Sequence, residues 1–171
     1  MKRLALVFVL AAVALSAGCT MLGYQLGSML PADIQTVFIP TCENRTTEPL
    51  IEQQTTRAIM AAVQMNGSLK IVREESAADA SLVVILNEFW LSPVSYVKGD
   101  ASTANGYRMN IRASYRLVRR SDNKVLAESP GLVGWSEFEM TGDMTTSKSV
   151  ALRPAAEDLG RRIIDQIVES W

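Results

Sequence analysis

The sequence predicts an α/β (α+β) two-layer sandwich, in which a mixed sheet of four to five strands has two helices packed on one face. Three patterns lead to this prediction. Apolar residues recur at helical spacing at 49–64 and again from Leu152 to Ile167, and polar and apolar residues alternate from Arg108 to Leu117. Two amphipathic helices and one sheet bury their apolar faces most simply as two packed layers.

The N-terminal segment has the plan of a secretory signal. Lys2 and Arg3 precede an apolar run at 4–15, and three small residues at 16–18 lie directly before Cys19. A charged end, an apolar middle and a small-residue cleavage site are the three parts of such a signal. The run is too short for a helix that crosses a bilayer, which needs roughly 20 residues.

The cysteine at the cleavage point makes the segment resemble a bacterial lipobox, with Ser16 where Leu is usual and Leu15 one position earlier. We therefore expect lipidation of Cys19, and Thr20 after it favours export to the outer membrane. An ordinary signal peptide with a coincidental Cys is the alternative. The predicted parts are a lipoprotein signal peptide at 1–18, a lipidated tether at 19–33 and a single α/β domain at 34–171.

The first half of the domain predicts strand, helix, strand. Ile34–Pro40 is rich in β-branched and aromatic residues and predicts a strand, followed by a polar loop at 41–48. A helix is expected from Pro49 to Gln64, because proline suits the first helical position. Gly67 then ends the helix, and Ser68–Arg73 predicts a short second strand.

A long strand is expected at Ala80–Val94, after a charged connection at 74–79. Its section Leu82–Leu86 is apolar at every position, which indicates burial on both faces, or on one face with a partner on the other. Pro93 marks an end or a bend of the strand. The following residues 98–106 are rich in small and polar residues and predict a loop.

The clearest strand signal is Tyr107–Arg119, because alternation over this length gives one wet and one dry face. The apolar set is Met109, Ile111, Ala113, Tyr115 and Leu117. A turn at 121–124 leads to a returning strand at Val125–Phe138, in which Pro130 and Gly131 imply a bulge or an edge position. An irregular loop is expected at 139–149, before the terminal helix.

The residue types limit the chemistry. The chain has no His, which excludes sites built on a Ser-His-Asp or Cys-His pair and sites with His as a metal ligand. Cys42 lacks a partner if Cys19 carries lipid, and it is expected to be a small buried hydrophobic residue. We therefore expect no enzymatic activity, no metal and no cofactor.

The net charge gives no sign of nucleic-acid binding. Removal of residues 1–18 takes away Lys2 and Arg3 and no acidic residue, so the formal charge changes from −1 to −3. A nucleic-acid-binding domain would instead show a clear excess of basic residues.

One polar pattern is a candidate binding site. Arg108, Arg112 and Arg116 share the wet face of the strand at 107–119, with Arg119 and Arg120 at its end. The planar guanidinium group suits phosphate, so this row is a candidate contact for an anionic lipid headgroup or for a protein partner. A solvated face that keeps an edge soluble is the alternative.

Several short motifs, in their order and spacing, resemble the lipopolysaccharide-assembly lipoprotein family (LptE-like). They include Gly23-Tyr24-Gln25-Leu26, Ile34, Val37, Ile39-Pro40, Asn44-Arg45-Thr46 and Pro49. They continue with Thr55-Thr56-Arg57-Ala58, Gly67, Leu69, Val72, Ala78-Asp79-Ala80-Ser81-Leu82, Arg112-Ala113-Ser114-Tyr115-Arg116-Leu117 and the closing helix from Ala155. The resemblance extends over almost the whole mature chain, and Cys42 departs from it.

The resemblance implies a sheet with two helices on one side, lipid-anchored at the periplasmic leaflet of the outer membrane. It further implies that the protein plugs and helps to assemble an LptD-like β-barrel translocon, and that it binds lipopolysaccharide. From this sequence, the row Arg108, Arg112 and Arg116 is the expected contact for lipopolysaccharide or for the barrel.

Two functions of other classes remain open at this point. One is a structural envelope lipoprotein that binds peptidoglycan or another envelope partner. The other is a periplasmic hydrolase, which the absence of His disfavours.

Overall fold

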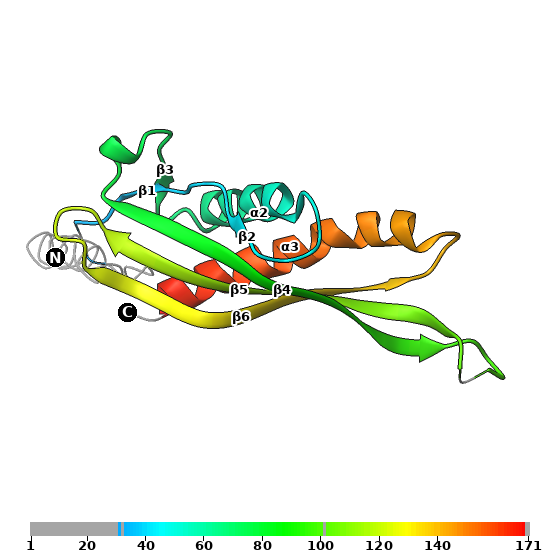
Figure 1. Cartoon of the computed structure of the whole chain (residues 1–171). Coiled ribbons are helices and arrows are strands. Elements are labelled where there is room, and N and C mark those ends of the chain that lie inside the picture. The colour runs from blue at the N-terminus through cyan, green and yellow to red at the C-terminus, as the bar shows by residue number, and fades with distance from the viewer. Residues whose placement is uncertain (1–30, 32, 101, 170–171) are drawn as a thin grey trace, which may run out of the picture.

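The computed structural model describes residues 31, 33–100 and 102–169, so the predicted signal peptide, Cys19 and most of the tether lie outside the described residues. It confirms the two-layer α+β architecture, with both helices on one side of the sheet (Figure 1). The elements are β1 (Thr36–Phe38), β2 (Glu43–Asn44), α2 (Ile51–Asn66), β3 (Lys70–Ile71), η2 (Glu75–Ala77), β4 (Ala80–Tyr96), β5 (Ala104–Arg119), β6 (Val125–Glu139) and α3 (Met144–Glu169).

The sheet is mixed, as predicted. In the described part of the chain it has six strands in the order β3-β1-β4-β5-β6, and β2 pairs with β4 further along the same edge as β1. The short strands run parallel to their neighbours, whereas β4, β5 and β6 are long and antiparallel. A helical crossover joins β1 to β3 through α2, which is the usual connection between parallel strands.

The alternation in β5 is confirmed, because all five residues of its predicted dry face are at most 2% exposed. The apolar section of β4 also alternates. Leu82, Val84 and Leu86 are buried on the helix side, while Val83 and Ile85 are half-buried on the opposite face. Within the described residues, Leu82–Leu86 is therefore not buried on both faces. This agrees with the second interpretation of the sequence, in which one face packs in the core and the opposite face is open to a partner.

The bulge expected at Pro130 and Gly131 is present. Ala113 pairs with Leu132 and Tyr115 pairs with Ser129, so two residues of β6 stand opposite one residue of β5. The strand continues through this irregularity to Glu139, and it forms one edge of the sheet. An extra residue in one strand bends that strand and raises its local twist.

Helix α2 begins at Ile51 and not at Pro49 as predicted. Leu50 has a left-handed backbone with φ of 62°, so the residue after the proline forms a turn and the helix starts only afterwards. The helix continues to Asn66, past the predicted Gln64, and stops at Gly67 as predicted. Gly67 has φ of 74°, and its N–H donates to the Val63 carbonyl oxygen. Glycine adopts this conformation at little cost.

Helix α3 begins at Met144, so part of the loop predicted at 139–149 is helical. The Asp143 carboxylate accepts hydrogen bonds from the backbone N–H and the hydroxyl of Thr146, at 2.9 and 2.7 Å. This contact satisfies a free N–H of the first helical turn. The Thr- and Met-rich composition suggested a loop, but an N-terminal cap and burial of Ser147 and Ala151 stabilise two further turns.

The two layers approach each other closely at two glycines. A Cβ atom added at Gly134 on β6 would overlap the backbone of Leu159 on α3. A Cβ added at Gly160 would lie 3.0 Å from backbone atoms of Ala58, where α3 touches α2. Because these two glycines have no side chain, α3 can lie directly on β6 and on α2.

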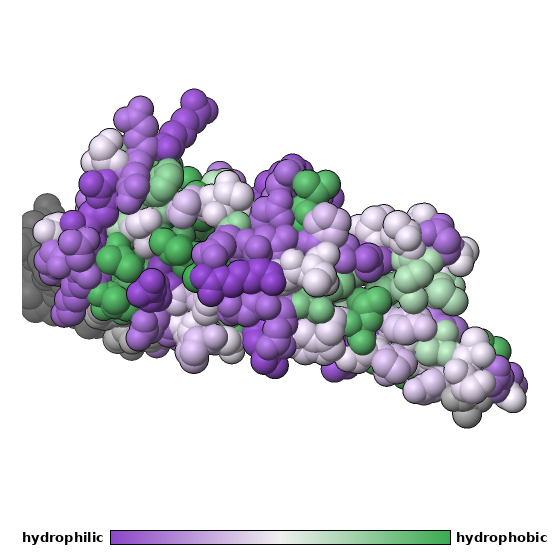
Figure 2. Space-filling view, in the orientation of Figure 1, coloured by the Kyte–Doolittle hydropathy of each residue, from purple (hydrophilic) through white to green (hydrophobic). Residues whose placement is uncertain are grey.

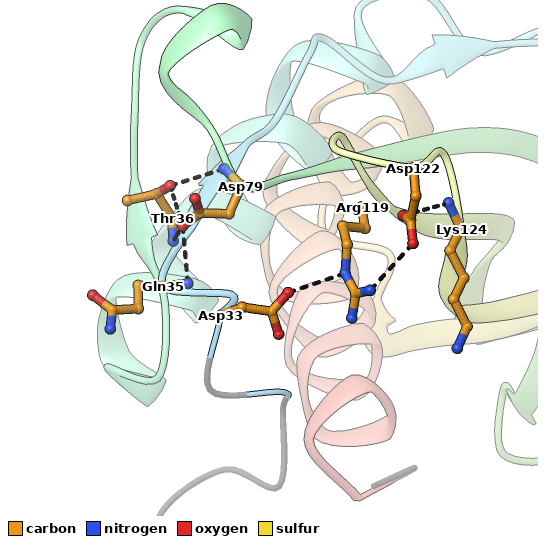
Figure 3. A network of polar contacts seen from close by, with 7 residues as sticks. All are labelled: Asp33, Gln35, Thr36, Asp79, Arg119, Asp122 and Lys124. Atoms are coloured by element: carbon orange, nitrogen blue, oxygen red, sulfur yellow. Dashed lines mark hydrogen bonds and ion pairs between the residues drawn. The ribbon is translucent and has the colours of Figure 1, made fainter.

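A network of hydrogen bonds and ion pairs connects residues 33–36, at the start of the domain, to Asp79 and Arg119 (Figure 3). The Asp79 carboxylate accepts hydrogen bonds from the Gln35 N–H and from the N–H and hydroxyl of Thr36, at 2.7 to 3.0 Å. Beside it, Arg119 forms ion pairs with Asp33 and Asp122, each at 3.2 Å. The chain therefore enters the sheet through a defined set of contacts.

The hairpin of β4 and β5 extends beyond the helices at the end of the molecule away from β1 (Figure 1). Exposed apolar side chains lie along it, at Val94, Tyr96 and Val97. None of the described helices combines the length and the apolar character that a membrane crossing requires.

Candidate functional site

The predicted arginine row lies on the face of the sheet that points away from the helices. Arg108, Arg112 and Arg116 alternate with the buried residues of β5, and Arg116 is the most exposed of the three. Successive arginines are four residues apart, so their Cα atoms are separated by about 13 Å. The structure thus puts the three on one face, but too far apart for a single small anion to contact all of them.

Arg108 is held by a neighbouring strand. Its Nη2 and Nε donate to Oε1 of Glu137 on β6 at 2.6 and 3.1 Å. Its guanidinium carbon also lies 4.6 Å from the centre of the Trp135 ring. Because both partners of the ion pair are nearly half exposed, the pair contributes at most about 1 kcal/mol to folding. The Glu137 carboxylate nevertheless offsets the positive charge that Arg108 would present to a ligand.

Arg112 contacts the same two kinds of partner, a glutamate and a tryptophan, on the opposite neighbouring strand β4. Its Nη1 donates to Oε1 of Glu88 on β4 at 3.1 Å, and its guanidinium carbon lies 5.3 Å from the centre of the Trp90 ring. The aliphatic part of its side chain lies beside Gly131 in the bulge of β6. Each of these two arginines therefore combines a carboxylate with an aromatic face, as cation–π contacts commonly do.

A row of two tryptophans and an asparagine crosses the sheet between these arginines. Asn110 on β5 pairs in register with Trp90 on β4 and with Trp135 on β6. Asn110 is only 7% exposed, and its Nδ2 donates to the Arg108 carbonyl oxygen at 3.1 Å. The centre of the outer face is thus a set of aromatic, amide and ion-paired side chains, not a free row of cations.

Arg116 differs from the other two. It stands opposite Val83 on β4 and Glu128 on β6, and no carboxylate of the described residues lies within ion-pair distance of it. It borders a shallow depression of about 300 Å³ in the outer face. The lining residues are Val83, Ile85, Ser114, Tyr115, Arg116, Glu128, Ser129 and Pro130.

This arrangement suits a molecule that is both apolar and anionic. Val83, Ile85 and Pro130 offer apolar surface in the depression, and the exposed Arg116 guanidinium at its border can donate to a phosphate or carboxylate. On the face that Figure 2 shows, hydrophilic side chains separate the hydrophobic patches, so no single apolar surface covers that face. A ligand of this kind would contact small apolar areas flanked by polar groups.

Sequence reasoning missed the partners of the arginines. Glu88 and Trp90, and likewise Trp135 and Glu137, are two residues apart on their strands, so their alternation was visible in the sequence. The pairing of these residues with β5 was not visible in the sequence, because the bulges at Asn87 and at Pro130–Gly131 shift the register of β4 and β6. A one-residue shift moves every later side chain to the other face.

Other reactive groups do not form a site. Cys42 is 3% exposed, and burial raises the pKa of its thiol despite a hydrogen bond with Thr56. A buried thiol with a raised pKa is a poor nucleophile, so the expectation of a small buried residue is confirmed. Across residues 31, 33–100 and 102–169, no three His, Cys, Asp or Glu side chains gather as a metal site would require.

Comparison with known families gives one match over most of the chain. The family model described as "LptE: Lipopolysaccharide-assembly" matches residues 34–169. The match begins where the tether was predicted to end and extends to the last described residue of α3. No curated protein matches the sequence.

Solved structures of similar fold include bacterial lipoproteins. A minor lipoprotein from Acinetobacter baumannii has a TM-score of 0.52 at 12% identity, covering 80% of this chain and 94% of that chain. Protein XCC0632 from Xanthomonas campestris has a TM-score of 0.55 at 12% identity, with 84% and 88% covered. The PelC dodecamer from Paraburkholderia phytofirmans has a TM-score of 0.53 at 14% identity, with 83% and 93% covered. At these identities the likeness supports the fold.

Proposed function

Because the chain belongs to the lipopolysaccharide-assembly family LptE, we propose that it plugs and helps to assemble an LptD-like β-barrel translocon and assists insertion of lipopolysaccharide into the outer leaflet. The family consists of non-enzymatic, envelope-associated lipoproteins of lipopolysaccharide assembly. The observation that carries the proposal is the match of the family model to residues 34–169, which is nearly the whole described domain.

The proposed location is the periplasmic face of the outer membrane, with Cys19 as the lipid-bearing residue. Two or three acyl chains anchor a protein stably, since each buried methylene contributes about 0.8 kcal/mol. The small residues at 16–18 directly before Cys19 support cleavage there. The domain would then be tethered by residues 19–33.

The proposed lipopolysaccharide contact is the outer face around Arg116. Lipopolysaccharide carries both acyl chains and phosphates, and the depression offers apolar surface beside an exposed guanidinium without an ion-paired carboxylate. Arg108 and Arg112 contribute only if an incoming phosphate replaces Glu137 or Glu88 as their partner. Phosphate accepts paired hydrogen bonds from a guanidinium group as carboxylate does, so a phosphate can replace either glutamate as the acceptor.

The test measures lipopolysaccharide binding and barrel recovery on the same preparations. Arg116→Glu should weaken lipopolysaccharide binding several-fold, more strongly at low salt where charges are least screened. Arg153→Glu is the matched control, because it makes the same charge change at an exposed position on α3. Unchanged binding in Arg116→Glu, with folding intact, would remove Arg116 from the site.

The partner is tested separately. A tagged full chain, isolated from its own membranes with mild detergent, should recover an integral β-barrel protein in a constant ratio. Recovery of peptidoglycan fragments without a barrel protein would favour a structural envelope lipoprotein instead. The Arg116→Glu chain should still recover the barrel if the arginine serves lipopolysaccharide, and should lose it if the arginine faces the barrel wall.

A further inference from the structure

Three residues of the outer face, Trp90, Asn110 and Trp135, have no part in the proposed contact around Arg116. They form an aromatic row that crosses β4, β5 and β6 in register. The two tryptophans are separated by two strand spacings, which is roughly 10 Å. Trp135 is 39% exposed and Trp90 is partly exposed. A ligand that lies across the strands can therefore contact both indole rings.

The aromatic row carries hydrogen-bonding groups that the protein itself does not use. Among the described residues, none accepts a hydrogen bond from the indole N–H of Trp90 or Trp135, and none donates to Oδ1 of Asn110. The Asn110 Nδ2 is engaged, since it donates to the Arg108 carbonyl oxygen at 3.1 Å. Two donors and one acceptor along the row are thus available to a ligand.

An ion pair flanks each tryptophan. One is formed by Glu88 with Arg112 and the other by Glu137 with Arg108. In both pairs the arginine donates to Oε1 of the glutamate, so Oε2 can accept a hydrogen bond from a ligand. The four charges cancel, and the row therefore suits an uncharged ligand, in contrast to the anion expected at Arg116.

A saccharide has the matching chemistry. The C–H groups on the face of a pyranose ring pack against the electron-rich face of an indole ring, and the hydroxyl groups at its edge both donate and accept hydrogen bonds. Two linked pyranose rings span about the distance between the two tryptophans. An acyl chain would instead leave the indole N–H groups without partners, and buried polar groups without partners are costly.

We propose that the aromatic row binds a saccharide of at least two linked sugar rings. One ring packs on each tryptophan, and hydroxyl groups bond to Asn110, Glu88 and Glu137. Two saccharides of the envelope have this chemistry, the sugar headgroup of lipopolysaccharide and the glycan strand of peptidoglycan. The first source rests on the proposed function, whereas the second would give the chain a contact with the cell wall.

Calorimetric titration of the full chain, kept in a detergent without sugar groups, tests the proposal. A neutral tetramer of β-1,4-linked N-acetylglucosamine represents the glycan strand, and the deacylated sugar headgroup represents lipopolysaccharide. At least one of the two should bind, and the tighter one identifies the source. The probe that binds should do so at least tenfold more tightly than N-acetylglucosamine alone, because only a longer probe reaches both tryptophans. Binding of neither probe, or equal affinity for the single sugar, overturns the inference.

The same titrations separate this inference from the proposed function. A chain that binds whole lipopolysaccharide but neither saccharide retains the proposed function and loses the saccharide site. A chain that binds the neutral tetramer but not lipopolysaccharide retains the saccharide site, with the cell wall as its source, and loses the proposed lipopolysaccharide contact.

Substitutions locate the site. Trp90→Ala and Trp135→Ala should each weaken binding of the tighter probe at least tenfold, with thermal midpoints measured on the same preparations. Tyr96→Ala is the matched control, because it removes an exposed aromatic ring of β4 outside the row, and its affinity should equal that of wild type. Trp135→Phe keeps an aromatic ring but lacks the indole N–H, so it should fold and bind severalfold more weakly. Unchanged affinity in either folded Trp135 variant contradicts the proposal.

Discussion

Asp79 shows how one side chain organises the entry to the sheet. Its carboxylate accepts from Thr36 and Gln35, which ties β1 to the residue that precedes β4 (Figure 3). The Thr36 hydroxyl, followed by the two backbone N–H groups, lowers the pKa of Asp79 below its ordinary value. Hydrogen bonds to the charged form have this effect.

The lowered pKa predicts a pH dependence. The ionised Asp79 stabilises the fold at every pH above its unfolded pKa of about 3.9, and this contribution is lost as the pH falls through the lower folded pKa. Asp79→Asn should therefore lower the free energy of unfolding by about 1 kcal/mol at pH 7, and the difference from wild type should shrink below pH 4. Urea unfolding across this range measures it, and a difference that is constant with pH would contradict the assignment.

At the scale of elements, the contact between α3 and β6 depends on the absence of a side chain. Gly134 lies under Leu159, and one residue along the strand the Trp135 N–H donates to Asp158 on α3 at 3.1 Å. Burial alone would raise the pKa of Asp158, but hydrogen bonds from Arg162 and Trp135 outweigh it and the pKa is lowered. The helix thus covers part of the sheet edge that β6 exposes.

Gly134→Ala should separate these two elements. The added Cβ overlaps the Leu159 backbone, so we expect the free energy of unfolding to fall by roughly 1–3 kcal/mol. Gly131→Ala on the same strand is the control. Its Cβ would meet the Arg112 Cδ at 3.6 Å and Cγ at 3.8 Å, which are ordinary contacts, and its effect should stay within about 0.5 kcal/mol. Similar urea midpoints for the two variants would show that α3 lies further from β6.

At the scale of the whole molecule, β1, with which the described sheet begins, and the projecting hairpin of β4 and β5 lie toward opposite ends (Figure 1). The hairpin carries the exposed apolar side chains of Val94 and Tyr96. A lipid at Cys19 would therefore hold one end near the bilayer and leave the other for a partner.

Cys19→Ala should abolish this attachment, because it removes the sulfur that accepts the lipid. The expected result is a mature chain without acyl groups that leaves the membrane fraction in high salt. Intact mass measurement of the wild-type chain should show acylation at Cys19, and Cys42→Ala should not change it. An unacylated wild-type N-terminus at another residue would contradict the lipoprotein assignment.

The sequence by itself determined those features that depend on neighbours along the chain. Alternation from Met109 to Leu117 assigned the buried face of β5, and Gly67 ended α2, because each depends on local backbone geometry. The absence of His excluded whole classes of site. Short motifs in order led to the LptE family, which the family model confirms.

Only the tertiary structure decided what those residues meet. The charges of Arg108 and Arg112 are paired with Glu137 and Glu88 across strands, whereas Arg116 remains exposed beside an apolar depression. The bulges in β4 and β6 set these pairings, and a bulge shifts register without a local signal of how far. Contacts between residues far apart in the sequence depend on strand register and on packing, and the residue spacing within one strand predicts neither.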